Sequence, residues 1–322
     1  MSRIDEVRLM TKIATMYYEH GFRQQEITAR LNIHQSTISR LLKQARKEGI
    51  VRISVAAPDG VFSKMEQQLE ARYELKEAIV VDTLDDDERV VRDLGAAAAF
   101  YLETNAKPGM IIGISSWSRS LMAMLASLHQ SSIAADGKVV QILGGVGNSG
   151  SRLQATQLAR DLAERIGATA VLLQAPGVVA SSEAKLVLTN DPVVKEASAL
   201  FGKVDLALVG IGTMTPSPLL SKSGNVFSAA EHKSLRALKA VGDICLRFFD
   251  GAGKLVNSPL QDRVIGVDLN VLRRADRVVG IAGGPSKRMA VRAALLGGWI
   301  NVLITDRATA EFLLAQEPRG SH

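Results

Sequence analysis

Cysteine is almost absent from this sequence, which holds Cys245 alone among 322 residues. A single cysteine excludes an intrachain disulfide and suits a reducing compartment. Cys245 stands in an apolar stretch, where we expect a buried and unreactive thiol. The chain also lacks an apolar run of membrane-spanning length and an apolar signal-peptide core at its N-terminus. We therefore expect a cytoplasmic protein without a membrane partner.

Histidine is scarce as well, and no histidine stands beside a carboxylate in a loop that follows a strand. The five histidines fall in the N-terminal segment, in polar helical settings or at the last residue: His20, His34, His129, His232 and His322. General acid–base chemistry needs a positioned proton acceptor. A Walker A spacing and a complete dinucleotide fingerprint are missing too. The sequence predicts no catalytic residue, no metal site and no cofactor. A binding function is therefore favoured over an enzymatic one.

What the chain does contain is an uneven charge. The chain has 39 Lys/Arg and 33 Asp/Glu residues. The first 54 residues hold ten of the basic residues and five of the acidic ones, so the remainder holds 29 basic and 28 acidic residues. The net charge of +6 is thus concentrated in one short segment. Such a basic segment favours a polyanionic partner. With 47% hydrophobic and 22% charged residues, the whole chain is expected to be globular.

The basic segment has the pattern of a helix-turn-helix. Helices are expected over residues 5 to 20, 24 to 31 and 35 to 48, with Asn32 in the left-handed turn between the second and third. The second helix of such a motif enters the major groove of operator DNA. Gln and Arg at its first turns can read base edges, and hydroxyls and further basic residues can contact phosphates. The candidate DNA-binding residues are Gln35, Ser36, Thr37, Ser39, Arg40, Lys43 and Arg46.

Turn chemistry in AAPDG, residues 56 to 60, predicts a domain boundary and gives domains 1–55 and 56–322. In the second domain, apolar runs alternate with helical segments. The runs are EAIVVD, GMIIGIS, KVVQILGG, TAVLLQA, VDLALVGIG, DRVVGIA and INVLITD. Apolar strands separated by helices predict an α/β fold with a parallel sheet that is covered on both faces. Ligands of such folds bind at the carboxyl ends of the strands.

Two strand-end loops carry the chemistry of an anion or sugar site. GISSWSRSL, residues 113 to 121, crowds hydroxyls at a helix start, where N–H groups and the helix dipole favour an anion. GGPSK, residues 283 to 287, places a lysine in the first turn of a helix, which is unfavourable unless an anion compensates it. Less specific candidates follow other strands, where Gly permits close approach and Asp243 can accept sugar hydroxyls. The candidate effector-binding residues are Ser115, Ser116, Trp117, Ser118, Arg119, Gly144, Gly212, Asp243, Gly284 and Lys287. Arg247 and Asp250 are expected to form a structural pair.

Four segments in this order resemble the SorC family of bacterial transcriptional regulators, over nearly the whole chain. They are QQEITARLNIHQSTISRLLKQARKEGIVRISV, VGIGTMTPSPLLSKSG, GDICLRFFDGAGKLVNSPLQDRVIGVDLN and ADRVVGIAGGPSKRMAVRAALLGG. The resemblance implies a catalytically silent effector domain similar to the fold of glucosamine-6-phosphate deaminase, ribose-phosphate isomerase and CoA transferases. It also implies sugar or sugar-phosphate effectors, dimers or tetramers, and a phosphate held by residues 113 to 121 and Lys287.

The loop at residues 113 to 121 departs from the family pattern, because it is one residue longer than Gly-x-Ser-x-Gly-x-Thr-Leu and has Ser118 near the usual Gly. A phosphorylated effector, a free sugar and a polyol therefore all stay open. The sequence predicts a DNA-binding regulator of carbohydrate metabolism that is controlled by such an effector. The alternative is a sugar-phosphate isomerase or deaminase with an appended DNA-binding segment.

Overall fold

The structure is a computed structural model, and it describes residues 3–51, 60–83, 86–115, 118–145, 149–215 and 228–316. The chain forms two compact units, Met1–Pro58 and Asp59–His322. The boundary expected between residues 55 and 56 lies outside the described residues. No helix in these described ranges is long and apolar enough to cross a membrane.

Residues 3–51 of the first unit form three helices, α1 (Arg3–Tyr18), α2 (Gln24–Leu31) and α3 (Gln35–Lys47). Asn32 has φ 54° and takes the left-handed conformation expected for the turn between α2 and α3. The apolar faces of the helices meet in one small core, whose fully buried members are Met10, Ile13, Ile27, Ile38, Leu41 and Ala45. Helical spacing of apolar residues therefore produces three helices around a common core.

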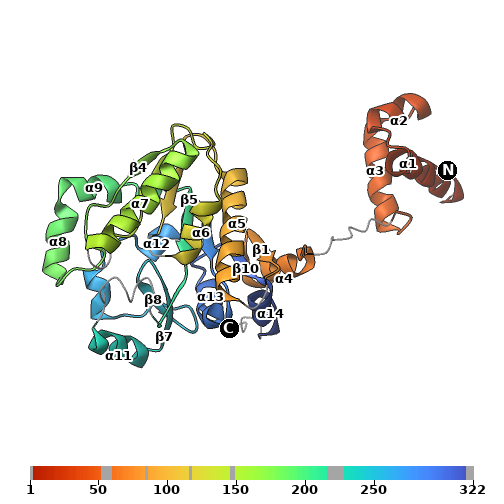
Figure 1. Cartoon of the computed structure of the whole chain (residues 1–322). Helices are drawn as coiled ribbons and strands as arrows, with labels where there is room; N and C mark the ends of the chain where they lie inside the picture. Colours follow the sequence, from red (N-terminus) through yellow and green to blue (C-terminus); the bar gives the residue numbers. More distant parts are fainter. Residues whose placement is uncertain are drawn as a thin grey trace. The chain divides into compact units, whose positions relative to one another are not determined.

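The second unit is an α/β domain (Figure 1). Its large sheet consists of β1 (Glu77–Val81), β2 (Ile111–Ile114), β3 (Lys138–Gln141), β4 (Thr169–Val171), β5 (Leu206–Gly210), β9 (Arg277–Ile281) and β10 (Val302–Asp306). Among its described residues the α-helices are α4 (Ser63–Tyr73), α5 (Asp87–Asn105), α6 (Arg119–Ser127), α7 (Ser149–Ile166), α8 (Ser182–Asn190), α9 (Pro192–Ser198), α11 (Ala229–Ala237), α12 (Leu269–Leu272), α13 (Arg288–Leu296) and α14 (Arg307–Ala315). Short 3-10 turns are η1 (Phe201–Lys203), η2 (Pro259–Arg263) and η3 (Pro285–Lys287).

All seven apolar runs picked out in the sequence are strands of this sheet. The strand order is β1-β10-β9-β5-β2-β3-β4, and every neighbouring pair is parallel. From β2 the chain continues to β3 and β4 on one side, whereas from β5 it later continues to β9 and beyond on the other. The carboxyl ends of β2 and β5 therefore flank the point where the winding direction changes, which is where such sheets form crevices.

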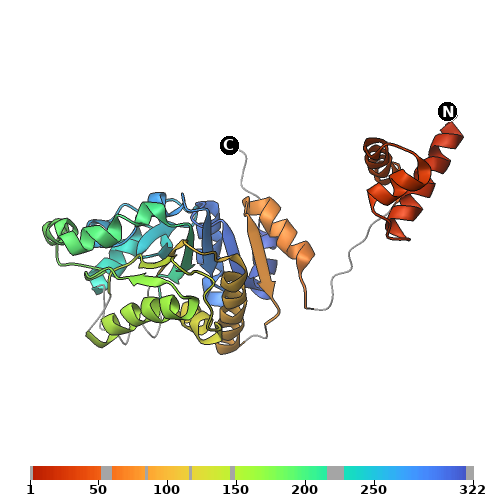
Figure 2. The same ribbon diagram turned by 90° about the horizontal axis from the view of Figure 1, so that it is seen from above.

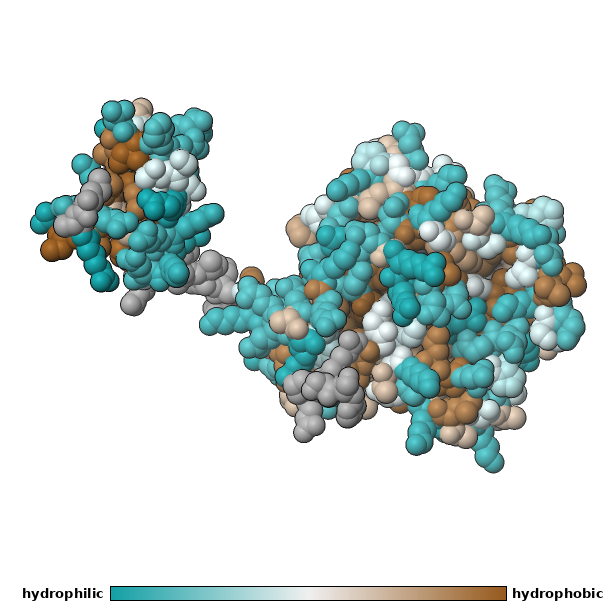
Figure 3. Space-filling view, turned by 180° about the vertical axis from the view of Figure 1, so that it is seen from behind, coloured by the Kyte–Doolittle hydropathy of each residue, from teal (hydrophilic) through white to brown (hydrophobic). Residues whose placement is uncertain are grey.

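Helices cover both faces of the sheet, as the uniformly apolar strands require. One core joins α5, α6 and α7 to one face, and a second joins α4, α13 and α14 to the other. Figure 2 shows this layering, with the brown, yellow and green helices α5 to α7 on one side and the blue helices on the opposite side. The faces visible in Figure 3 are mostly hydrophilic in both units, with smaller hydrophobic areas.

A second, smaller sheet was not expected from the sequence. It is antiparallel and consists of β6 (Gly212–Thr213), β7 (Ala240–Ile244) and β8 (Arg247–Asp250). The two residues that connect β7 to β8, Cys245 and Leu246, have φ 52° and φ 60°. Two-residue hairpin turns with positive φ at both positions normally use Asn and Gly, so this turn is strained.

Candidate functional site

A pocket of about 400 Å³ lies at the carboxyl ends of the parallel strands, a size within the usual range for small-molecule sites. We call it the strand-end pocket. It is lined by residues that follow β1, β2, β3, β5 and β9 and by the β7–β8 hairpin. Among them are Asp87, Val90, Val91, Ser115, Ser118, Arg119, Ser120, Leu143, Gly212, Thr213, Asp243, Cys245, Leu246, Ser286 and Lys287. Parallel strand order thus brings together loops that lie far apart in the sequence.

Six of the ten candidate effector residues line this pocket: Ser115, Ser118, Arg119, Gly212, Asp243 and Lys287. Ser116 and Trp117 lie outside the described residues. Gly144 and Gly284 are not among the lining residues. Gly144 packs against backbone instead, because a Cβ there would lie 2.6 Å from the carbonyl oxygen of Ala175. Gly284 has φ 90°, and its N–H donates to the Asp306 carboxylate at 2.7 Å.

Two serines hold the β2–α6 loop against β5. The Ser115 hydroxyl is buried and accepts a hydrogen bond from the N–H of Gly210 at 3.2 Å. Ser118 is the N-cap of α6, where its hydroxyl accepts from the N–H of Leu121 at 3.4 Å. Gly210 must be small here, since a Cβ would lie 2.6 Å from the Ser118 hydroxyl oxygen. The start of α6 therefore faces the pocket with Arg119 in its first turn.

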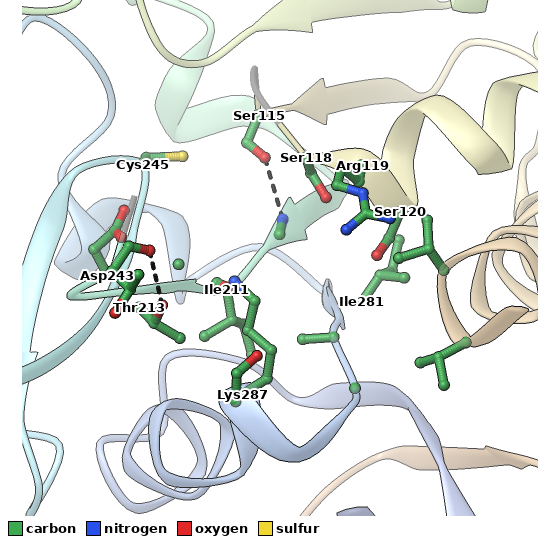
Figure 4. A pocket seen from close by; sticks show the side chains of 18 of the residues that line it. Ser115, Ser118, Arg119, Ser120, Ile211, Thr213, Asp243, Cys245, Ile281 and Lys287 are labelled. Carbon is green, nitrogen blue, oxygen red and sulfur yellow. Dashed lines mark hydrogen bonds between the residues drawn. The ribbon is translucent and has the colours of Figure 1, made fainter. Parts of the chain in front are cut away.

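Lys287 belongs to η3, and its Nζ donates to the carbonyl oxygen of Ile211 at 2.7 Å. The pKa of its amine is lowered, chiefly because burial disfavours the ammonium form, while Asp243 opposes that shift and Arg119 adds to it. Figure 4 shows Lys287 and Arg119 on different elements around one space. Two cations that share a partly buried pocket repel each other, and an anionic ligand group would relieve that repulsion.

Asp243 lies on β7 across the pocket from α6 (Figure 4). Burial raises the pKa of its carboxyl to about 6, against the lowering effects of the N–H of Leu246 and the charge of Lys287. The N–H of Leu246 donates to Asp243 Oδ2 at 3.0 Å, so the carboxylate also holds the strained hairpin turn. A Cβ on Gly212 would collide with Asp243 Oδ1, which explains the glycine at that position.

The raised pKa predicts how stability depends on pH. Between the unfolded-state pKa of about 3.9 and the folded value of about 6, the folded protein binds more protons, so its free energy of unfolding falls as pH rises. Asp243→Asn mimics the protonated form and can still accept from Leu246. We expect the variant to match the wild type near pH 4 and to be more stable at pH 7.5, by at most about 3 kcal/mol. Urea unfolding at both pH values tests this, and a pH profile identical to that of the wild type would contradict it.

Several lining residues gave no clear indication in the sequence. Asp87, Val90 and Val91 come from the start of α5, and they reach the pocket only because that helix follows a strand end. Cys245 and Leu246 reach it through the unexpected hairpin. Cys245 is buried and free as expected, and burial raises the pKa of its thiol to about 12.

The expected pair between Arg247 and Asp250 is wrong. The Arg247 guanidinium donates to the carbonyl oxygens of Val267, Gly266 and Gln261 and to the Gln261 side chain, at 3.0 to 3.4 Å. Asp250 instead accepts from the N–H groups of Ala252 and Lys254, each at 3.0 Å. Both residues are structural, because each satisfies backbone groups near the β7–β8 hairpin.

In the first unit, α3 has one buried and one polar face. Ile38, Leu41, Leu42 and Ala45 are buried on one side. Of the seven candidate DNA-binding residues, Gln35, Ser36, Arg40, Lys43 and Arg46 are exposed, and Thr37 and Ser39 are half-buried. Arg46 has a partner within the unit, since its Nε donates to the Tyr18 hydroxyl at 2.8 Å and its guanidinium lies 5.5 Å from the centre of that ring.

Comparisons with known proteins cover both units. Residues 61–315 match a family model described as "Putative sugar-binding domain". The chain is 34% identical over 320 residues to the sorbitol operon regulator of Klebsiella pneumoniae, covering 98% of this chain and 100% of that protein. It is 32% identical over 311 residues to the deoxyribonucleoside regulator of Bacillus subtilis, covering 96% and 98%.

Solved structures agree with these matches. The crystal structure of the full-length sorbitol operon regulator SorC from Klebsiella pneumoniae superposes with a TM-score of 0.72 and 33% identity. The superposition covers 96% of this chain and 99% of that chain. Both the α/β unit and the preceding helices therefore fall within the likeness.

Proposed function

The chain belongs to the SorC family of sugar-binding transcriptional regulators, and from this premise we propose that it binds operator DNA through α3 and a sugar-type effector in the strand-end pocket. The relatives named above are regulators, not enzymes. Among the described residues, the lining of the pocket includes no histidine, the most frequent general base. The effector thus acts as a control molecule and not as a substrate.

The proposed DNA-binding element is a helix-turn-helix made of α2, the turn at Asn32, and α3. Its support is the polar, basic face that α3 leaves exposed while its apolar face is buried. A recognition helix needs this division, because its inner face must hold it on the scaffold while its outer face reaches into the major groove. Domain limits close to 1–55 and 56–322 would then separate DNA binding from effector binding.

Gln35, Ser36 and Arg40 are the proposed base-reading residues, since they are exposed on the first turns of α3. Thr37, Ser39, Lys43 and Arg46 are the proposed phosphate contacts. Tyr18 holds Arg46 in place before DNA arrives, which reduces the entropy lost when this side chain binds.

The proposed effector is a sugar, a polyol or a sugar phosphate. One observation carries this proposal: two cations, two carboxylates and several hydroxyls converge on a single pocket of about 400 Å³. Arg119, Lys287 and the start of α6 can hold a phosphate or another anionic group. Asp243 and Thr213 lie together on the other side in Figure 4, where they can bind sugar hydroxyls. The larger unit would act as a silent relative of the sugar-phosphate isomerase and deaminase fold, within a dimer or tetramer.

A thermal-shift screen tests this pocket. The probes are sorbitol, sorbitol 6-phosphate, 2-deoxyribose 5-phosphate and inorganic phosphate, chosen from the pocket chemistry and the names of the two relatives. A compound present at a hundredfold excess over its Kd adds about 2.7 kcal/mol of stability, which corresponds to roughly 5–10 °C in Tm. We expect a phosphorylated probe to give the larger shift. A larger shift with free sorbitol would identify an uncharged effector, and retention of promoter DNA that no sugar or polyol alters would contradict the regulator proposal.

A further inference from the structure

We infer that helix α14 couples the strand-end pocket to helix α4, with Asp306 and Arg72 as the positioning residues at its two ends. This inference rests on the proposed function, because it names the route by which an effector would act on the DNA-binding unit. Helix α4 is the first helix of the second unit, and it begins at Ser63, shortly after the first unit ends at Pro58. A change in the position of α4 therefore also changes the position at which the chain from the first unit enters the second unit.

The N-terminal end of α14 is tied to the pocket loop. Asp306 is 2% exposed and caps α14, with Oδ1 accepting from the N–H of Thr309 at 2.9 Å. Its Oδ2 accepts from the Thr309 hydroxyl at 2.6 Å and from the N–H of Gly284 at 2.7 Å. A Cβ on Gly283 would collide with this same oxygen. Because η3 also packs against α14, the backbone that presents Lys287 is set by Asp306.

The C-terminal end of α14 is tied to α4. Nη1 of Arg72 contacts the carbonyl oxygens of Leu313, Leu314 and Gln316 at 3.1, 2.5 and 2.8 Å. The Tyr73 hydroxyl donates to the carbonyl oxygen of Leu313 at 3.0 Å. The last carbonyls of a helix lack partners within the helix, and a cation there is favoured by the helix dipole. These contacts make the end of α14 and the end of α4 one connected body.

Helix α4 is also bound to the outer strand of the large sheet. Strand β1 is an edge strand, and its outward N–H groups at Ala78 and Val80 donate to the carboxylates of Glu70 and Glu66, each at 3.0 Å. These glutamates take the place of a neighbouring strand and protect the edge. Displacement of α4 therefore costs hydrogen bonds both on β1 and on α14.

The mechanism follows from these contacts. A ligand that touches Lys287 shifts the loop of residues 283–287 and with it the Gly284–Asp306 hydrogen bond. Because α14 is a nine-residue helix held at both ends, a shift at its first turn is carried to the carbonyls that Arg72 holds. Packed side chains and rigid helices are the elements through which such coupling travels. By linkage, loss of the contacts at Arg72 must loosen the pocket loop in turn.

Amide hydrogen exchange on the full chain, without effector and without DNA, tests this coupling. Arg72→Met keeps the apolar stem and removes the contacts with α14. We expect the amides of residues 283, 284, 286 and 287, the Gly284 amide above all, to exchange about tenfold faster than in the wild type. The matched control is Arg165→Met, because Arg165 donates to the carbonyl oxygen of Leu128 at 2.6 Å, at the C-cap of α6. The control is expected to leave residues 283–287 at the wild-type rate.

Faster exchange confined to α4 and the last turn of α14 would overturn the inference, and so would equal acceleration of residues 283–287 by the control. Asp306→Asn gives a second test from the other end. Its carbonyl oxygen can still cap α14, but its amide cannot accept from Gly284, so the amides of α4 are expected to exchange faster. Wild-type rates in α4 of this variant would also overturn the inference. Neither outcome bears on whether the chain binds operator DNA or a sugar, which the thermal-shift screen and DNA binding decide separately.

Discussion

Lys287→Met is expected to lower the affinity for a phosphorylated effector such as sorbitol 6-phosphate by about 10- to 150-fold, since a hydrogen bond to a charged group contributes about 1.5–3 kcal/mol. Methionine keeps the length and apolar stem of Lys287 but removes the ammonium that shares the pocket with Arg119. Isothermal titration of wild type and variant measures the change. Operator affinity without effector should stay within a factor of two, because Lys287 lies in the second unit.

A control variant and an uncharged ligand test whether the loss of affinity is due to the ammonium of Lys287. Lys254→Met removes an exposed lysine of the same unit that does not line the pocket, and it should leave effector affinity unchanged. Free sorbitol carries no anionic group, so its affinity should fall much less in Lys287→Met than that of the phosphate. Equal affinity of wild type and variant for every probe would mean that Lys287 only satisfies the carbonyl of Ile211.

Arg40→Ala is expected to lower specific operator affinity by about 5- to 150-fold, because a bidentate contact between an arginine and a guanine contributes about 1–3 kcal/mol. Arg40 is exposed on α3, so its loss removes no contact within the core of the first unit. Fluorescence anisotropy with promoter DNA and with random DNA, at matched salt, separates specific from non-specific binding. The ratio of the two affinities should fall with the specific one.

Lys43→Ala provides the contrast for Arg40→Ala. A phosphate contact weakens binding to all DNA alike and lowers the salt slope by about one. Arg8→Ala removes an exposed arginine of α1, outside the helix-turn-helix formed by α2 and α3, and serves as the matched control. If Arg8→Ala and Arg40→Ala lower operator affinity equally, the positive charge of the first unit binds DNA without a recognition helix.

Much of the fold could be predicted because it depends on local patterns. Apolar runs without polar alternation predicted seven parallel strands, and all seven are present. The left-handed turn at Asn32 and the buried face of α3 followed from residue type and helical spacing. The smaller antiparallel sheet was missed, because its hairpin turns at Cys245 and Leu246, residues that carry no turn preference.

The candidate pocket was predicted only in part, because local patterns identify the chemistry of each strand-end loop but not which loops meet. Serines at a helix start and a lysine in a first turn can be recognised in any strand-end loop, so Ser118 and Lys287 stood out. Gly144 also follows a strand, yet it packs against Ala175 and is not among the lining residues. Asp306 has no distinctive neighbours in the sequence, although it sets the backbone of the loop at residues 283–284.

By itself, the sequence determined the basic first segment and the α/β class of the rest. It also determined which loops at strand ends carry hydroxyl and cationic side chains. Those properties depend on residue type and spacing over a few turns or one strand. Only the tertiary structure decided which of those ends meet, because strand order places β9 beside β5 and β5 beside β2 through pairings between distant residues. The same long-range pairings bring Arg72 to the end of α14 and Asp306 to the pocket loop, and no local pattern contains them.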